Sequence, residues 1–400
     1  MSTGWDWDFS CAQRVCGAEL PDCAKGLKWA PDGTCFLTAC DDNWLRIYEL
    51  PAHVLSGGGA EQGEAAELLA PAVSVRESET VYDYCWFPRM NSADPTTCCF
   101  VSSSRDQPIH LWDAFTGALR GTYAAYNQLD EVAAAYSLAF SNDGARIFCG
   151  FERAVRVFDT SRSGRQVEDR PTATTKRAQD GLRGMLASIA VDPSGSGLYA
   201  VGSYSGATGV YTEADGQLVC LLGGHTAGVT QVTFSPDGRT LVTGARRDGR
   251  LLCWDVRQTG RVLRACERVA DSNQRIMFSL DSGSRWLASG SQDGTALAFD
   301  LAADATAPPL VLTRSAHAVN AAMLHPLLPL LGVATGERER AFLAASGSDS
   351  DSGSEESVAE GEPVGADAPS ARAPSAAATD HPHAIAVHKV GWVPLAVVAQ

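Results

Sequence analysis

The chain has 400 residues, 45% of them hydrophobic, which is enough for one large repetitive domain or for several ordinary ones. The formal net charge of −15 argues against a general nucleic-acid coat protein, because such proteins bind through an excess of basic residues. The 12 cysteines include no Cys-x-x-Cys pair, so zinc and disulfide sites are disfavoured and buried thiols in a reducing compartment are expected.

Signals for membrane insertion and for common enzyme chemistry are missing from the sequence. Residues 1–9 contain no apolar signal core, and the apolar stretch at 323–333 is too short and too broken by proline to span a bilayer. No Gly-rich phosphate loop, His-Glu-x-x-His motif or paired-carboxylate motif occurs. We therefore expect an intracellular, soluble protein without membrane partner, cofactor, metal or enzymatic activity.

One pattern of short strands and turns recurs along the chain, with copies at 27–48, 81–113, 137–159, 188–211, 224–255, 276–300 and 319–334. The fifth copy is the clearest, because it starts with Gly224-His225 and ends with Trp254-Asp255. Its first turn, Ser235-Pro236-Asp237-Gly238, combines a proline that fixes φ with a glycine that accepts positive φ. A Gly-His start and a Trp-Asp finish within 40–45 residues are typical of one blade of a WD-repeat propeller.

These copies predict an all-β, seven-bladed WD-repeat β-propeller over residues 21–345. Residues 1–20 are expected to supply a closing strand, with Trp5 to Val15 as the candidate, because an open ring would expose sheet edges. Segment 346–383 is acidic and of low complexity, so we expect a disordered insert there. Residues 384–400 are a C-terminal segment that could supply a strand of the last blade, and 56–79 and 160–182 are expected to be polar loops.

Four residues of the fifth copy are predicted to form a hydrogen-bonded tetrad inside the blade: His225, Thr243, Asp248 and Trp254. Such a network satisfies polar groups that would be costly to bury alone. A His–Thr–Asp set also resembles a hydrolytic triad, but no nucleophile elbow accompanies it, so the structural interpretation is favoured. The tetrad recurs in part elsewhere in the chain, at Ser102, Asp106 and Trp112 and at Ser289, Asp293 and Phe299.

The positions next to the tetrad aspartate are expected to lie on one face of the ring, close to the central channel. They bring together Arg105, Arg246 and Arg247 with Tyr204 and Phe151, and in the third copy Arg153 occupies the aspartate position itself. Interleaved arginine and aromatic side chains suit single-stranded nucleic acid, through phosphate pairing and base stacking. The pattern alone favours protein binding over nucleic-acid binding and leaves both open.

Several runs are not generic blade sequence. They are similar to the telomerase Cajal body protein family of WD-repeat proteins, over about 20–335, and include Val81-Tyr82-Asp83-Tyr84-Cys85-Trp86, Ser104-Arg105-Asp106-Gln107-Pro108, Leu222-Gly223-Gly224-His225, Gly244-Ala245-Arg246-Arg247-Asp248 and Asn273-Gln274-Arg275-Ile276.

This resemblance implies a non-enzymatic scaffold that binds small Cajal body RNAs and telomerase RNA and directs their ribonucleoproteins to Cajal bodies. The implied partners are a dyskerin-containing ribonucleoprotein, coilin-type Cajal body proteins and, for folding, the cytosolic chaperonin. The implied location is the nucleus and the Cajal body, and also the cytoplasm. The RNA-binding candidates are Arg105, Arg153, Tyr204, Arg246 and Arg247, followed by Arg275, Tyr82 and Tyr126. The alternative is a general protein–protein interaction propeller without direct RNA binding.

Overall fold

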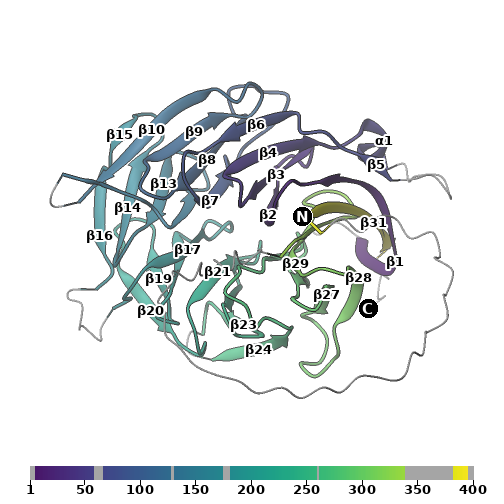
Figure 1. Cartoon of the computed structure of the whole chain (residues 1–400). Helices are drawn as coiled ribbons and strands as arrows, with labels where there is room; N and C mark the ends of the chain where they lie inside the picture. The colour runs from purple at the N-terminus through teal and green to yellow at the C-terminus, as the bar shows by residue number, and fades with distance from the viewer. Residues whose placement is uncertain are drawn as a thin grey trace, which may run out of the picture.

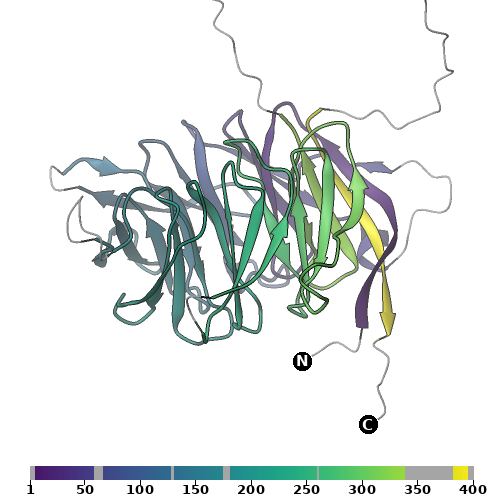
Figure 2. The ribbon, with the colours of Figure 1, turned by 90° about the horizontal axis from the view of Figure 1, so that it is seen from below.

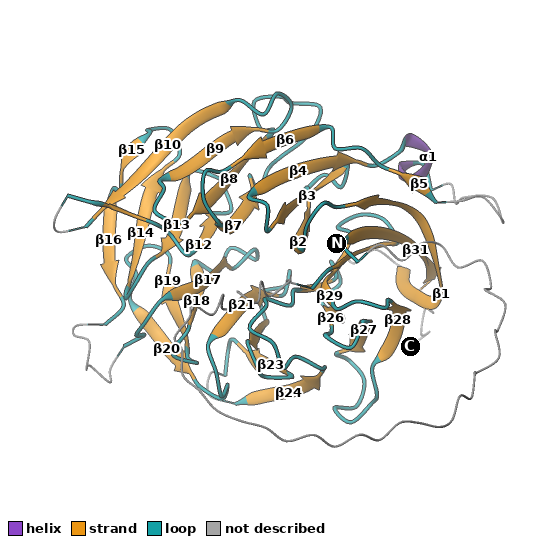
Figure 3. Ribbon diagram, in the orientation of Figure 1, coloured by secondary structure: helices purple, strands orange, loops and turns teal. Residues whose placement is uncertain are grey.

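A computed structural model of the chain describes residues 5–57, 66–127, 130–173, 181–258, 261–337 and 382–394. Within these residues the strands form seven sheets around a central axis, as Figure 1 shows. Figure 3 shows one short helix in this part of the chain, α1 (Ala52–Leu55), at the outer edge of the ring. Seen from the side in Figure 2, the strands run between the two faces of a disc. The predicted all-β, seven-bladed propeller is confirmed.

Blades one to three are built in chain order, with the innermost strand first. Blade one consists of β2 (Ala24–Trp29), β3 (Cys35–Cys40), β4 (Trp44–Glu49) and β6 (Val73–Arg76). Blade two consists of β7 (Val81–Trp86), β8 (Cys99–Ser104), β9 (Ile109–Asp113) and β10 (Leu119–Tyr126), to which the short strands β11 (Val132–Ala133) and β15 (Gly164–Arg165) add. Blade three consists of β12 (Ser137–Phe140), β13 (Arg146–Gly150), β14 (Ala154–Asp159) and β16 (Glu168–Pro171).

Blades four to six follow the same order. Blade four consists of β17 (Leu186–Val191), β18 (Leu198–Ser203), β19 (Thr208–Thr212) and β20 (Leu218–Leu222). Blade five consists of β21 (Val229–Phe234), β22 (Thr240–Ala245), β23 (Arg250–Asp255) and β24 (Val262–Glu267). Blade six consists of β25 (Phe278–Leu280), β26 (Trp286–Gly290), β27 (Thr295–Asp300) and β28 (Leu310–Arg314).

Blade seven combines strands from distant parts of the chain and closes the ring. Its order is β29 (Val319–Leu324), β30 (Leu330–Thr335), β31 (Ala384–Pro394) and β1 (Trp5–Glu19), and β5 (Glu67–Leu68) adds in parallel to β1. Strands β1 and β31 are antiparallel and lie side by side in Figure 2, from the pair Trp5 and Pro394 to the pair Glu19 and Ala384. Most of the acidic segment, residues 346–381, lies outside the described residues.

Two segments expected to be loops contain outer strands. Residues 56–79 include β6, which pairs with β4, and 160–182 include β16, which pairs with β14. The outermost strand of a blade is half exposed, so it needs few apolar residues. In β16 the buried side chain is that of Arg170, whose guanidinium lies over the rings of Phe148 and Tyr199. Hydrophobic alternation is therefore absent from this strand.

Blade five shows how local sequence builds the sheet. The N–H of Gly238 donates to the carbonyl of Ser235 at 2.9 Å, and Gly238 has φ +69°, so the turn before β22 uses the conformation that favours glycine. Inside the sheet, His225 Nδ1 lies 2.9 Å from Asp248 Oδ2, and its Nε2 lies 2.9 Å from Thr243 Oγ1. The indole N–H of Trp254 donates to the same hydroxyl at 3.0 Å.

Burial lowers the pKa of His225 although the neighbouring Asp248 opposes this shift. The imidazole is therefore neutral at pH 7, donates from Nδ1 to the carboxylate and accepts the Thr243 hydroxyl proton at Nε2. The side chains of His225 and Asp248 are only 2% and 4% exposed. This set is enclosed in the blade and joins β22, β23 and the loop before β21.

Blade two uses another carboxylate in place of the predicted Asp106. Asp106 is exposed, whereas Glu77 is 1% exposed and accepts hydrogen bonds from Ser102, Ser104 and His110. Burial alone would raise the pKa of Glu77, but the bonds from His110 and Ser102 hold it below its usual value. The predicted Ser102–Asp106–Trp112 set is therefore wrong in its acidic member.

Blade six replaces the tetrad differently. Ser289 does not bond to Asp293, whose carboxylate instead accepts from Thr295. The Ser289 hydroxyl accepts from Arg268 Nη1 at 2.7 Å, and the same nitrogen donates to the carbonyl of Ile276 at 2.9 Å. Because Phe299 carries no N–H donor, the buried guanidinium supplies the donor that the tryptophan supplies in blade five. Burial lowers the pKa of Arg268 to about 9.

Replacing His225 with phenylalanine (His225→Phe) should lower the free energy of unfolding by about 1–3 kcal/mol, because Thr243 and Asp248 lose their shared partner inside the blade. Urea unfolding followed by tryptophan fluorescence measures this change. The same replacement at His53, whose side chain is 50% exposed, should leave the unfolding midpoint unchanged. Equal midpoints for His225→Phe and the wild type would contradict the network.

Candidate nucleic-acid interface at the channel mouth

A closed belt of hydrogen bonds joins the inner strands around the channel. Its members are polar side chains, buried except for the half-buried Lys28, and each is bonded to the inner strand of a neighbouring blade. The links are Lys28 to Asp83 (3.0 Å), Leu138 N–H to Asp83 (3.0 Å), Ser137 to the Leu186 carbonyl (2.8 Å), Val232 N–H to Ser188 (2.9 Å), Gln231 to the Phe278 carbonyl (2.8 Å), Ser279 to the Ala322 carbonyl (3.2 Å) and Asn320 to the Ala24 carbonyl (2.9 Å). This belt fixes the seven inner strands relative to one another.

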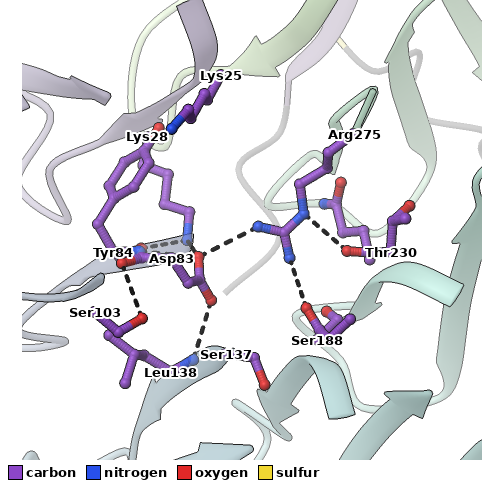
Figure 4. Close-up of polar contacts among 12 residues, drawn as sticks. Lys25, Lys28, Asp83, Tyr84, Ser103, Ser137, Leu138, Ser188, Thr230 and Arg275 are labelled. Atoms are coloured by element: carbon purple, nitrogen blue, oxygen red, sulfur yellow. Dashed lines mark hydrogen bonds and ion pairs between the residues drawn. The ribbon is translucent and has the colours of Figure 1, made fainter. Parts of the chain in front are cut away.

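An ion cluster in the middle of the channel strengthens the belt, as Figure 4 shows. Asp83 Oδ1 lies 3.0 Å from Lys28 Nζ and 3.3 Å from Arg275 Nη1, so one carboxylate meets two cations. Burial alone would raise the pKa of Asp83, but these two charges hold it below its usual value. Arg275 also donates to the carbonyls of Thr230 at 2.8 Å and Ala187 at 3.3 Å. It thereby connects blade two with blades four and five.

The channel opens into a cavity on each face of the ring. On one face, which we call the upper mouth, a cavity of about 430 Å³ is lined by Lys25, Tyr82, Arg105, Tyr136, Ala187, Tyr204, Thr230, Gln274, Arg275 and Asn320, among others. On the opposite face a cavity of about 560 Å³ is lined by mainly apolar side chains, including Trp86, Phe140, Phe234, Leu280 and Pro326. Arg275 and Met277 line both cavities, so they lie between them.

β-bulges place side chains around the upper mouth. The register between the first two strands shifts near the start of the inner strand in five blades, around Lys25, Tyr82, Ala187, Thr230 and Asn320. An extra residue at a bulge is left out of the ladder, and its side chain is turned relative to the sheet. These five residues all line the upper cavity.

Four of the predicted RNA-binding residues meet at this cavity: Tyr82, Arg105, Tyr204 and Arg275. Arg105 is exposed, and its Nε lies 3.4 Å from the hydroxyl of Tyr82. Arg275 lies deeper, and its guanidinium is occupied by Asp83 and by two backbone carbonyls. Arg105 is therefore available to a ligand at the rim, whereas Arg275 supports the floor.

Arg246 and Arg247 lie beside the rim, in the turn between β22 and β23. The guanidinium carbon of Arg246 lies 4.7 Å from the centre of the Tyr204 ring, a cation–π contact that links this turn to blade four. Arg247 is exposed and has φ +49°. Arg153 occupies a turn of blade three with φ +57°, and its Nε lies 3.8 Å from Glu152.

Tyr126 does not join this group. It lies at the end of β10, the outer strand of blade two, and its ring stacks against the guanidinium of Arg165 at 4.1 Å. Strand β10 is the fourth from the channel in its blade, because the order is β7, β8, β9 and β10. Tyr126 stands 13 residues after Asp113, which ends the second copy of the repeat. The chain between them leads into the outer strand β10, and this carries Tyr126 away from the mouth.

A spacing pattern in the sequence marks the five bulge residues, although the sequence prediction did not use it. Lys25, Tyr82, Ala187, Thr230 and Asn320 each stand six residues before the proline of the following turn, at Pro31, Pro88, Pro193, Pro236 and Pro326. The positions before the tetrad aspartate, on which the sequence prediction relied, do not include Lys25, Thr230 and Asn320, which also line the cavity. They also do not include Tyr136, whose ring lies 5.6 Å from that of Tyr82.

The mouth offers hydrogen bonding, stacking and positive charge. Among the described residues no group of three or more His, Cys, Asp or Glu side chains is placed to hold a metal ion. No helix in the described ranges is long and apolar enough to cross a bilayer. The groups present suit a polar ligand with aromatic and anionic parts.

Replacing Asp83 with asparagine (Asp83→Asn) should lower the free energy of unfolding by about 2–4 kcal/mol, because Lys28 and Arg275 lose the charge that balances them inside the channel. The urea midpoint measures this change. Asp130→Asn is the matched control, since the Asp130 carboxylate is 79% exposed where it pairs with Arg165, and its midpoint should equal that of the wild type. A wild-type midpoint for Asp83→Asn would show that the ion cluster does not stabilise the ring.

Comparison with known proteins agrees with the fold. The family description "WD domain, G-beta repeat" matches residues 16–49 and 216–255. Telomerase Cajal body protein 1 of Homo sapiens is 44% identical over 347 residues, which cover 84% of this chain and 62% of the human protein. The Drosophila melanogaster homologue is 36% identical over 320 residues, covering 78% of this chain and 56% of that protein.

A third relative has a different name. Guanine nucleotide-binding protein negative regulator 1 of Schizosaccharomyces pombe is 30% identical over 276 residues, covering 67% of this chain and 68% of that protein. The chain spans 62–64% of the length of the human, mouse, bovine and hamster telomerase Cajal body proteins that it matches. It belongs to the telomerase Cajal body protein family of WD-repeat proteins.

Proposed function

We propose that this chain is an RNA-binding WD-repeat scaffold whose upper mouth binds small Cajal body RNAs and telomerase RNA. The observation that carries the proposal is the gathering of Arg105, Arg246 and Arg247 with Tyr82 and Tyr204 at one channel mouth of a protein with net charge −15. Guanidinium groups pair with phosphates, and tyrosine rings stack on unpaired bases. A single-stranded loop of RNA presents both groups at once.

The names of the relatives support the biological setting. The mammalian and fly relatives are named for telomerase and for the Cajal body. On this basis we propose that the chain acts in the nucleus, at Cajal bodies. The resemblance of its sequence to the family adds to the proposal that it passes through the cytoplasm, where the chaperonin folds it. It directs ribonucleoproteins that contain dyskerin to Cajal bodies, with coilin-type proteins as partners there, and it acts without catalysis.

Within this proposal the candidate residues have different roles. Arg105, Arg246 and Arg247 pair with phosphates, while Tyr82 and Tyr204 stack on bases. Arg275 positions the floor of the cavity, because its donors are occupied by Asp83 and the Thr230 and Ala187 carbonyls. Arg153 is a peripheral phosphate contact, and Tyr126 lies outside the site.

A protein-interaction scaffold without direct RNA binding is the second candidate, and one observation favours it. The outer strands of blades four to six expose neighbouring apolar side chains, including Val219 (52% exposed), Leu263 (51%) and Val311 (44%). Exposed apolar groups on outer strands suit protein partners. On this account RNA would be recovered only through those partners.

The double variant Arg246→Glu/Arg247→Glu should reduce RNA recovered after ultraviolet crosslinking in cells by about tenfold or more, because reversed charges repel phosphates. Sequencing of the crosslinked RNA and quantification against protein give the readout. Arg239→Glu/Arg257→Glu is the matched control, since it reverses two exposed arginines at the opposite end of blade five and should leave recovery unchanged.

Two outcomes would contradict the proposal. Equal recovery by both double variants and the wild type, with unchanged unfolding midpoints, would remove these arginines from the site. If the purified protein binds no isolated RNA loop at moderate salt, while the same proteins still co-purify with it after nuclease treatment, the protein-interaction scaffold is favoured.

A further inference from the structure

A second cavity adjoins the upper mouth on the same face of the ring. It is a shallow hollow of about 540 Å³ between the turns of blades three and four, and we call it the side hollow. Its lining consists of Glu152, Arg183, Gly184, Met185, Tyr204 and Ser205. Met185 and Tyr204 line both the side hollow and the upper-mouth cavity, so the two spaces lie next to each other. A strand that leaves the mouth over Tyr204 therefore enters the side hollow.

Hydrogen bonds hold the segment that forms one wall of the side hollow, directly before β17. The N–H of Arg153, in the turn between β13 and β14, donates to the carbonyl of Gly184 at 3.0 Å. The hydroxyl of Ser203, at the end of β18, donates to the carbonyl of Arg183. The segment is thus tied to blade three on one side and to blade four on the other. Its position is therefore fixed before any ligand binds, which lowers the entropy lost on binding.

The side chain of Arg183 is available to an anion. It is exposed, and no carboxylate among the described residues forms an ion pair with it. The carboxylate in the lining, that of Glu152, lies 3.8 Å from Nε of Arg153, which balances part of its charge. A guanidinium can donate two parallel N–H groups to one phosphate. Arg183 therefore gives the side hollow a positive charge that suits a phosphate.

Charge is unevenly distributed around this face of the ring. In blades two to five, the turns between the second and third strands have a net charge of +1, from Arg105, Asp106, Glu152, Arg153, Arg246, Arg247 and Asp248. Arg183, between blades three and four, raises this to +2. The same turns of blades one and six have a net charge of −3, from Asp41, Asp42 and Asp293. A polyanion is therefore attracted towards blades three to five and repelled by blades six and one.

We propose that the side hollow binds the phosphodiester backbone of RNA, with Arg183 as its phosphate-binding side chain. This inference rests on the proposed RNA binding and specifies the route of the strand. The strand leaves the channel mouth over Tyr204 and crosses the junction of blades three and four. Contacts of this kind orient the strand and add affinity for any sequence, because every nucleotide carries the same phosphate.

The test measures how salt changes the affinity of the purified full-length chain for RNA. The probe is a fluorescein-labelled, unstructured single-stranded RNA that contains all four bases, and its anisotropy is followed from about 50 to 200 mM potassium chloride. For single strands, each phosphate contact adds about 0.7 to the slope of log affinity against log salt concentration. Replacing Arg183 with glutamine (Arg183→Gln) should therefore reduce the slope by about 0.7.

Two further variants serve as references. Arg314→Gln removes an exposed arginine on the same face, at the end of β28 in blade six, and should leave the slope unchanged. Arg246→Gln/Arg247→Gln removes two phosphate contacts of the proposed function and should reduce the slope by about 1.4. Urea midpoints equal to that of the wild type verify that each variant is folded.

The outcomes separate the inference from the function on which it rests. A lower slope for Arg183→Gln, with a wild-type slope for Arg314→Gln, supports the backbone site. If Arg183→Gln keeps the wild-type slope, the backbone site is wrong, and a lower slope for Arg246→Gln/Arg247→Gln then shows that RNA binding at the mouth stands. Equal reductions for Arg183→Gln and Arg314→Gln would reflect total charge and overturn the route. If the wild type binds no RNA, both the route and direct RNA binding are wrong.

Discussion

The closed belt of hydrogen bonds between inner strands is the constraint on which the rest of this ring depends. Each blade is a sheet that can bury its faces only against its neighbours, so blades must be held at fixed distances from the axis. Polar side chains such as Ser188 and Gln231 achieve this by bonding to the backbone of the next inner strand. Asp83 adds charge to the belt by meeting Lys28 and Arg275 inside the channel.

The same belt positions the candidate site. Three of the five bulge residues stand directly before belt residues in the chain: Tyr82 precedes Asp83, Ala187 precedes Ser188, and Thr230 precedes Gln231. Their side chains therefore reach the upper mouth from strands that the belt already holds in place. Pre-organised groups of this kind lose little entropy on binding. The tetrad of His225 and the networks of Glu77 and Arg268 stabilise individual blades.

Much of the ring could be predicted from turn chemistry and repeat spacing. Motifs such as Ser235-Pro236-Asp237-Gly238 act locally, and they identified the inner three strands of most blades. The outer strand β16 was missed because polar residues can form a half-exposed strand. Glu77 was missed because the sequence alone does not distinguish a buried carboxylate from a solvent-exposed one. The burial of Glu77 depends on partners distant in the sequence, such as Ser102 and His110.

The candidate site was predictable in the same uneven way. Arg105, Tyr204 and Arg246 follow from the position of the tetrad aspartate within the repeat. Bulge residues such as Asn320 depend on a register shift between two strands, which periodicity does not contain. The sequence named Arg275 as an RNA-binding candidate without giving its position, and its ion pair with Asp83 arises from a contact between residues 192 positions apart.

The central claim is that RNA contacts the upper mouth of the channel directly. Mapping of the peptides crosslinked to RNA after ultraviolet irradiation of the wild-type protein in cells, by mass spectrometry, tests it most directly. The account predicts crosslinks in the peptides that contain Tyr82, Tyr136 and Tyr204. Crosslinks confined to the outer strands β20, β24 and β28 or to the apolar opposite mouth would contradict it.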